Sequence, residues 1–219
     1  FRFASQPASS TEAVIPATGS NSALAANPAN TRSAWQSHQL YMGHFAISDS
    51  QNQRFYHAER FSRSALGLAG VEQAPLRAWL YDWQFSAKSS DDGPPWQLQL
   101  QARMDESDGS STEFTLDLEL NLDHPRVLQG EQGYSPKGGD AASHYYSYPR
   151  LRGAGTLRIG DQEFSVNGSS WLDREWGSGG LAAHHQGWDW FALQLDDGGD
   201  LMWYQLRNKD GSLDPASQG

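Results

Sequence analysis

The feature that most constrains this chain is a recurrent alternation of apolar and polar residues, in the absence of any amphipathic helix of useful length. Between Phe114 and Leu122 every second residue is Phe or Leu, and the residues between them are Thr, Asp, Glu and Asn. A period of two indicates a strand with one buried face. The run from Trp96 to Met104 alternates in the same way, and a turn-rich segment joins the two runs, so they predict an antiparallel hairpin.

Similar patterns occur along most of the chain. Strands are predicted at 39–47, 53–61, 79–85, 156–159, 163–166, 188–195 and 201–207, with one helical turn near 62–70 and a Gly/Pro/Ser loop at 125–144. We count eight or nine strands in sequential hairpins. Such a meander closes most simply into an up-and-down barrel, because closure removes exposed edges. The predicted fold is therefore an all-β antiparallel barrel, and barrels of about eight strands can hold one small ligand.

Composition narrows the classes of function. The 219 residues include 16 Lys+Arg and 26 Asp+Glu, a net charge of −10, which disfavours a nucleic-acid partner. Cysteine is absent, which excludes disulfides, thiol catalysis and cysteine-ligated zinc. Nine Trp, eight Tyr and nine Phe are typical of large packed aromatic faces or of an apolar cavity.

The segment 171–177 holds the densest group of chemically capable side chains. In a strand, Trp171, Asp173 and Glu175 share one face, and Arg174 and Trp176 point the other way. Two carboxylates beside an indole can have their pKa values driven apart, so that one keeps a proton and serves as an acid. The structural alternative is an ion-pair network that closes the end of the barrel.

A second group lies at 187–191 and in the strand that follows it. Asp189 shares a face with apolar residues, which requires a partner or a raised pKa. Trp188 and Trp190 take the opposite face, and Tyr204 lies across the hairpin. Two interpretations stay open: one face is buried against another domain, or the aromatic residues line a pocket for an apolar ligand.

The histidine spacing and the motifs typical of hydrolases identify no further site in this sequence. His57 and Glu59 share a strand face and could form an acid/base couple, or His57 is structural. The seven histidines show neither HExxH nor HxH spacing, so no metal site and no cofactor are predicted. The chain also lacks a Gly-x-Ser-x-Gly nucleophile elbow and a phosphate-binding glycine loop.

Five motifs carry a family resemblance: WQSHQLYMGHFAISD, FYHAERF, VLQGEQGYSPKG, SSWLDREWGS and GWDWFALQLDDGGDLMWYQLRNKDG. Together they resemble the carotenoid 1,2-hydratase / AttH-like lipocalin family, whose bacterial members are often labelled predicted secreted hydrolases. The resemblance implies two tandem lipocalin-like barrels. Residues 34–214 are then an incomplete first barrel, and 215–219 begin a linker to an absent second one. Residues 1–33 are expected to be a strand end followed by a long flexible loop.

The resemblance also implies a periplasmic or secreted protein, with a signal or lipoprotein anchor upstream of this chain. Its chemistry would be hydration of an isoprenoid double bond, as by a hydro-lyase, in which a neutral carboxyl protonates carbon and aromatic faces stabilise the cation. The rival is a non-catalytic lipid carrier or accessory factor of an envelope transporter, and the hydrolase label has least support. The candidate catalytic residues are Asp173, Glu175, Asp189, Tyr204 and His57, and the candidate ligand-binding residues are Trp171, Arg174, Trp176, Trp188 and Trp190.

Overall fold

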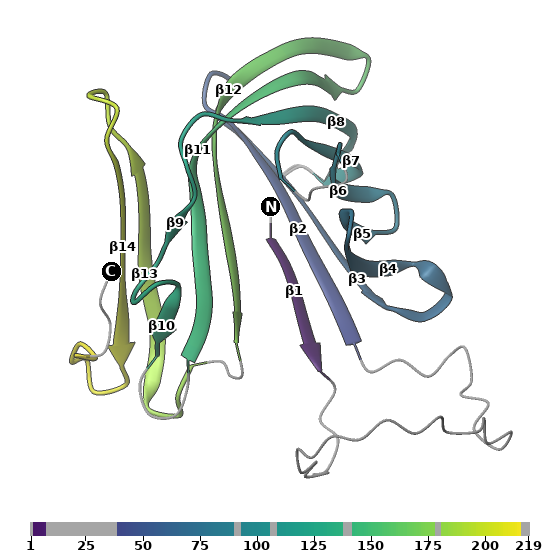
Figure 1. Ribbon diagram of the computed structural model, residues 1–219. Helices are drawn as coiled ribbons and strands as arrows, with labels where there is room; N and C mark the ends of the chain where they lie inside the picture. The colour runs from purple at the N-terminus through teal and green to yellow at the C-terminus, as the bar shows by residue number, and fades with distance from the viewer. Residues whose placement is uncertain are drawn as a thin grey trace, which may run out of the picture. The chain divides into compact units, whose positions relative to one another are not determined.

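A computed structural model describes residues 2–7, 39–89, 93–105, 109–137, 142–177 and 181–215 (Figure 1). These residues form antiparallel strands almost throughout, and the helical structure among them is a single 3-10 turn, η1 (Ala65–Gly67). The predicted all-β antiparallel class is confirmed. No helix in the described part of the chain is long and apolar enough to cross a membrane.

Fourteen strands are defined. They are β1 (Arg2–Pro7), β2 (Gln39–Asp49), β3 (Arg54–Arg63), β4 (Ala69–Gln73), β5 (Leu76–Leu80), β6 (Trp83–Ala87), β7 (Trp96–Asp105), β8 (Ser111–Leu122), β9 (Val127–Leu128), β10 (Tyr134–Pro136), β11 (Ala142–Ile159), β12 (Gln162–Gly177), β13 (His185–Gln194) and β14 (Asp200–Asn208). Strand β1 runs past the expected strand end at Phe3, into the segment predicted as a loop. Residues 8–33 of that predicted loop lie outside the described residues.

The chain divides into two compact units. Unit 1 comprises Phe1–Gly93, Gln97–Asp117 and Leu157–Phe164, and unit 2 comprises Pro94–Trp96, Leu118–Thr156 and Ser165–Gly219. In unit 1, β2 pairs with β1 and β3, and β5 pairs with β4 and β6, all antiparallel. The alternation predicted for this part buries one face, whose core residues are Phe45, Tyr56, Trp83, Leu100, Ala102 and Phe114.

The single strand predicted at 79–85 is wrong. The structure has two strands, β5 and β6, joined by a tight turn at Tyr81 and Asp82, with Tyr81 at a φ of 57°. Leu80 and Trp83 are paired directly across this turn, and both are fully buried. The buried positions therefore change from even to odd numbers at the turn, and Trp79 lies on the less buried face. A two-residue turn preserves the spacing of the aromatic residues, so the sequence pattern continues although the strand ends.

Unit 2 is built around the long strands β11 and β12. The predicted hairpin at 156–166 is only the tip of the β11–β12 hairpin, and most of that tip, Leu157–Phe164, belongs to unit 1. The predicted loop at 125–144 contains β9, β10 and the start of β11. Strands β9 and β10 pair with β11 at Tyr146↔Leu128 and Tyr134↔His144. The predicted hairpin at 188–207 is confirmed as β13–β14, and it forms a separate two-stranded sheet.

Side chains fasten this hairpin to β11. The Arg150 guanidinium donates to Asp200 Oδ1 at 2.8 Å, and His124 Nδ1 lies 2.6 Å from Asp200 Oδ2. The Gln194 amide donates to the carbonyl of Pro149 at 2.7 Å. Burial raises the pKa of Asp200, but the hydrogen bonds from Arg150 and His124 outweigh burial and hold that pKa below its ordinary value.

Replacing Arg150 with glutamine is expected to lower the free energy of unfolding by about 1–2 kcal/mol at pH 7. Because the folded-state pKa of Asp200 is depressed, this contribution is present above the unfolded-state pKa, near 4, and is lost as the pH falls through the folded value. Urea unfolding at pH 7 and pH 3 measures both effects. Arg152→Gln is the control, because Arg152 is 71% exposed in its pair with Asp123. If the difference in unfolding free energy between wild-type protein and Arg150→Gln stays constant down to pH 3, Arg150 does not act through the ionised Asp200 carboxylate.

Candidate functional site

The predicted faces of segment 171–177 are confirmed in β12. Asp173 and Glu175 face the buried side of β11, where Asp173 Oδ1 accepts a hydrogen bond from Ser147 Oγ at 2.6 Å. Arg174 and Trp176 take the other face, where the Arg174 guanidinium carbon lies 5.7 Å from the centre of the Tyr146 ring. The two faces of β11–β12 therefore carry different chemistry.

Asp173 is the centre of a half-buried polar network. Besides Ser147, its Oδ1 accepts a hydrogen bond from Trp171 Nε1 at 2.9 Å, and Ser147 Oγ in turn accepts one from Gln129 at 2.9 Å. Burial raises the pKa of the neighbouring Tyr145 phenol, and the charge of Asp173 raises it further. In these contacts Asp173 serves as the hydrogen-bond acceptor.

Tyr145 joins the two tryptophan motifs. Trp190 Nε1, from β13, donates to the Tyr145 hydroxyl at 3.2 Å, and the same hydroxyl interacts with Asp173. The structure therefore brings Trp171, Asp173 and Trp190 together, although they come from two separate sequence motifs. Trp176 does not take part, because it lies on the opposite face of β12 and stacks on His144 with ring centres 5.6 Å apart.

Glu175 has its own donors. Lys137 Nζ lies 2.7 Å from Glu175 Oε1, and Ser143 Oγ donates to the same oxygen at 2.6 Å. The cation that neutralises this acid is thus Lys137. Lys137 also lies 4.5 Å from the centre of the Tyr204 ring, and the buried Tyr204 hydroxyl pairs with Ser135 at 3.1 Å. We call these two linked groups, centred on Asp173 and Glu175, the polar core.

Asp189 lies outside the polar core. It occupies the face of the β13–β14 hairpin opposite Trp190 and pairs with Arg207 Nε at 3.3 Å, with 43% of its side chain exposed. That face carries exposed apolar side chains: Phe191, Leu193, Leu195, Leu201 and Trp203. Trp203 is thus exposed, whereas Tyr204, on the other face of β14, is buried.

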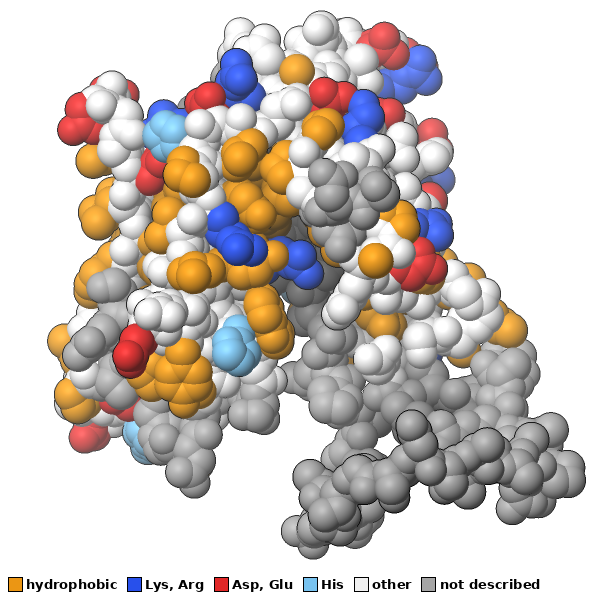
Figure 2. Space-filling model, viewed as in Figure 1, with side chains coloured by type: hydrophobic (Ala, Val, Ile, Leu, Met, Phe, Trp, Pro, Cys, Tyr) orange, Lys and Arg blue, Asp and Glu red, His pale blue; other side chains and the backbone are white. Residues whose placement is uncertain are grey.

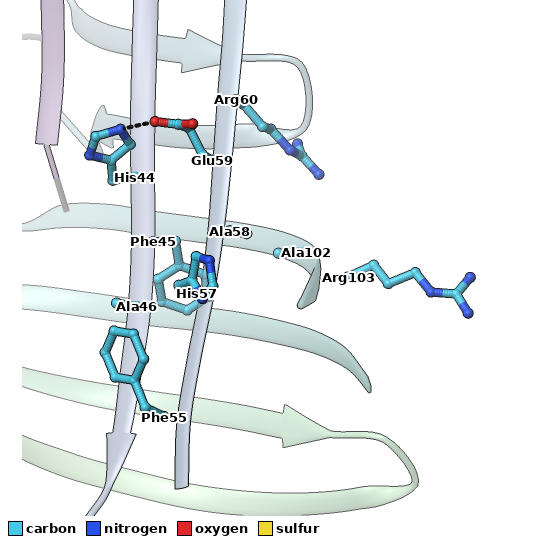
Figure 3. Close-up of a pocket in the computed structure, with 10 residues that line it drawn as sticks. All are labelled: His44, Phe45, Ala46, Phe55, His57, Ala58, Glu59, Arg60, Ala102 and Arg103. Carbon is cyan, nitrogen blue, oxygen red and sulfur yellow. Dashed lines mark hydrogen bonds and ion pairs between the residues drawn. The ribbon is translucent and has the colours of Figure 1, made fainter. Parts of the chain in front are cut away.

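His57 lines a cavity of about 550 Å³ in unit 1 (Figure 3). Glu59 bonds His44 across the strands at 2.6 Å, and His57 stacks on Phe55 with ring centres 5.9 Å apart, so the predicted couple of His57 and Glu59 is not formed. The cavity lies where β3 and β7 share one register pair, His57↔Asp105. Both members of the His44–Glu59 pair are about half exposed, so water has access to this pair.

A third cluster was not predicted from the sequence. His184, His185 and Asp214 place three potential metal-ligand atoms within 4.8 Å of one another. His185 Nδ1 accepts a hydrogen bond from the Ala182 amide at 3.1 Å, so the ring proton is on Nε2, which lies 2.6 Å from Asp214 Oδ2. A metal-ligating histidine normally donates from its second nitrogen. The cluster therefore fits a structural hydrogen-bond network better than a metal site. We call the contacts of His185 with the Ala182 amide and Asp214 the latch.

The other face of β11–β12 is aromatic and basic. The rings of Tyr146, Tyr148 and Trp176 contact one another edge to face, with centres 5.7 Å and 5.9 Å from that of Tyr146. Arg126 and Arg174 lie beside Tyr146, and a cavity of about 200 Å³ adjoins Tyr146 and Trp176. We call these five residues the aromatic–basic face. It contains Arg174 and Trp176, two of the predicted ligand-binding residues.

Sequence reasoning missed Lys137 and Ser143 because it read 125–144 as a loop, and it missed Tyr145 and Ser147 because it assigned no strand between that loop and residue 156. One signal was available. In SHYYSYP, Ser143, Tyr145 and Ser147 alternate with His144, Tyr146 and Tyr148, a period of two that identifies a strand with two distinct faces.

Comparisons with known proteins identify a family and a similar solved structure. A family model described as AttH-like matches residues 19–219. The crystal structure of a candidate AttH protein from Nitrosomonas europaea is similar, with 35% sequence identity and a TM-score of 0.72. The match covers 83% of this chain and 53% of that protein, so this chain spans about half its length. A comparison with curated proteins finds no match.

Proposed function

Because the chain belongs to the AttH-like family, we propose that it binds an apolar, lipid- or isoprenoid-like molecule as a lipocalin-like carrier. The observation that carries this proposal is the aromatic–basic face beside its cavity. Trp176 is 53% exposed there, although aromatic side chains of this size are normally well buried. An exposed wall of contacting rings is the kind of surface on which an apolar chain binds.

The arrangement of the acids favours binding over hydration. Asp173 and Glu175 accept hydrogen bonds from several donors, and Asp189 pairs with Arg207 in a half-exposed position. Acid-catalysed hydration needs a carboxyl that holds a proton next to the substrate. Hydration stays a second candidate because of one observation, the contact of Asp173 with the buried Tyr145 phenol. The hydrolase label has least support, because the sequence lacks a Gly-x-Ser-x-Gly nucleophile elbow.

We extend the proposal to the location and partners of the protein. A carrier of this type would act in the periplasm or outside the cell, exported by a signal peptide or held by a lipoprotein anchor. It would pass its ligand to an envelope transporter. The exposed apolar face of β13–β14 would pack against a second lipocalin-like barrel. The greater length of the Nitrosomonas europaea protein supports this second half.

Native mass spectrometry of the full-length protein tests the proposal. We expect a co-purified lipid or isoprenoid, or a stoichiometric complex after addition of farnesol. Trp176→Ala should lose most of this complex, and Trp79→Ala, a matched change in unit 1, should retain it. If wild-type protein carries no ligand and does not take up farnesol, the proposed function is wrong.

A further inference from the structure

The aromatic–basic face carries two arginines that pair with no carboxylate in the part of the chain that the structure describes. The guanidinium carbons of Arg126 and Arg174 lie 5.1 Å and 5.7 Å from the centre of the Tyr146 ring. Neither forms a salt bridge with a carboxylate of the described residues, in contrast to Arg150, Arg152 and Arg207 of the same unit. In a chain with a net charge of −10, this is a local excess of positive charge.

The surroundings of the two arginines are aromatic. Burial raises the pKa of Tyr148 and the neighbouring Tyr146 raises it further, while the charges of Arg126 and Arg174 lower it, which places both cations near this phenol as well. Trp96 packs against Tyr148 with ring centres 4.9 Å apart. Figure 2 shows basic side chains bordered by hydrophobic ones over β11 and β12. Arg126 also hydrogen-bonds the Tyr148 phenol, but a guanidinium carries five N–H donors and a ring face uses none of them, so both arginines keep donors for a ligand.

We propose that Arg126 and Arg174 bind the oxyanion headgroup, a carboxylate or phosphate, of an amphipathic ligand whose apolar chain lies on Tyr146 and Trp176. This inference rests on the proposed function and adds the charge of the ligand to it. A guanidinium fork matches a carboxylate or phosphate in geometry as well as in charge. The adjoining cavity of about 200 Å³ is lined by Arg126, Tyr146 and Trp176, and Arg174 lies beside Tyr146. Its volume suits a headgroup and the first part of a chain, not a whole lipid.

Isothermal titration calorimetry of the full-length protein tests this inference with five probes: decanoate, decyl phosphate, 1-decanol, acetate and inorganic phosphate. Decanoate or decyl phosphate should bind at least about tenfold more tightly than 1-decanol, the gain expected for one charge-assisted hydrogen bond. Acetate and inorganic phosphate should bind far more weakly, because they lack the chain. Added salt should weaken decanoate binding and leave 1-decanol binding unchanged.

Substitutions locate the site. Arg126→Gln and Arg174→Gln should each weaken decanoate binding by about tenfold and leave 1-decanol binding intact. Arg152→Gln is the control. It also removes one positive charge, from an arginine of β11 that forms an exposed pair with Asp123, and it should change neither decanoate binding nor 1-decanol binding. The salt dependence of wild-type protein gives an answer even if a variant fails to fold.

The outcomes separate the two proposals. If 1-decanol binds as tightly as decanoate and decyl phosphate, the proposed headgroup site is wrong and the carrier function stands. If acetate or inorganic phosphate binds as tightly as decanoate and decyl phosphate, the proposed site for an amphipathic ligand is also wrong, because the apolar chain then contributes nothing. If no chain-bearing probe binds, both proposals are wrong.

Discussion

Replacing His185 with alanine is expected to lower the free energy of unfolding by about 3 kcal/mol. The His185 side chain is fully buried, and its two ring nitrogens bond the Ala182 amide and the Asp214 carboxylate. The variant would leave that carboxylate, which is only 8% exposed, without its closer partner, and would also leave a cavity. The loss should loosen the segment around Asp214, whose amide bonds the carbonyl of Leu206 in β14.

Urea unfolding measures this effect, and His184→Ala is the matched control. His184 Nε2 lies 3.2 Å from the same Asp214 oxygen, but its side chain is 57% exposed, so its loss should cost less than about 1 kcal/mol. Equal losses in the two variants would contradict the latch. A zinc-dependent rise in the melting temperature of wild-type protein that His185→Ala abolishes would instead identify a metal site.

The sequence pattern was most informative where one strand face is buried against the core. The alternation in 96–104 and 114–122 predicted β7 and β8, because a buried face imposes a period of two on its strand. The same reasoning failed at 79–85, where a two-residue turn keeps the aromatic spacing. It also failed for β9 and β10, which are only two and three residues long and are stabilised by pairing with β11, not by their own composition.

The candidate site was predictable only in part. Strand parity correctly placed Asp173 and Glu175 on one face and Arg174 on the other, since parity is a local property. The donors that meet these acids, Ser147 and Lys137, come from β11 and the segment before it. Register between distant strands is fixed by tertiary packing, so no local pattern could identify those partners.

Asp173→Ala is expected to lower the free energy of unfolding by about 3 kcal/mol, because the hydrogen bonds from Ser147 and Trp171 lose their acceptor inside the polar core. Asp173→Asn should cost only about 1 kcal/mol, since an amide oxygen can still accept from both donors. Chemical denaturation of the two variants measures this difference. If alanine costs no more than asparagine, Asp173 does not hold the polar core together.

The asparagine variant also separates the carrier from the hydratase, because it removes the acid and preserves the shape of the site. A carrier predicts that wild-type protein and Asp173→Asn bind farnesol equally and that neither converts it. Acid catalysis through Asp173 predicts that wild-type protein forms a product one water heavier and that the variant binds farnesol without forming it. Mass spectrometry of the extracted ligand distinguishes these results. The carrier result is the expected one, because Asp173 Oδ1 already accepts hydrogen bonds from Ser147 and Trp171 and the carboxyl also interacts with Tyr145, so this side chain is engaged in holding the polar core together.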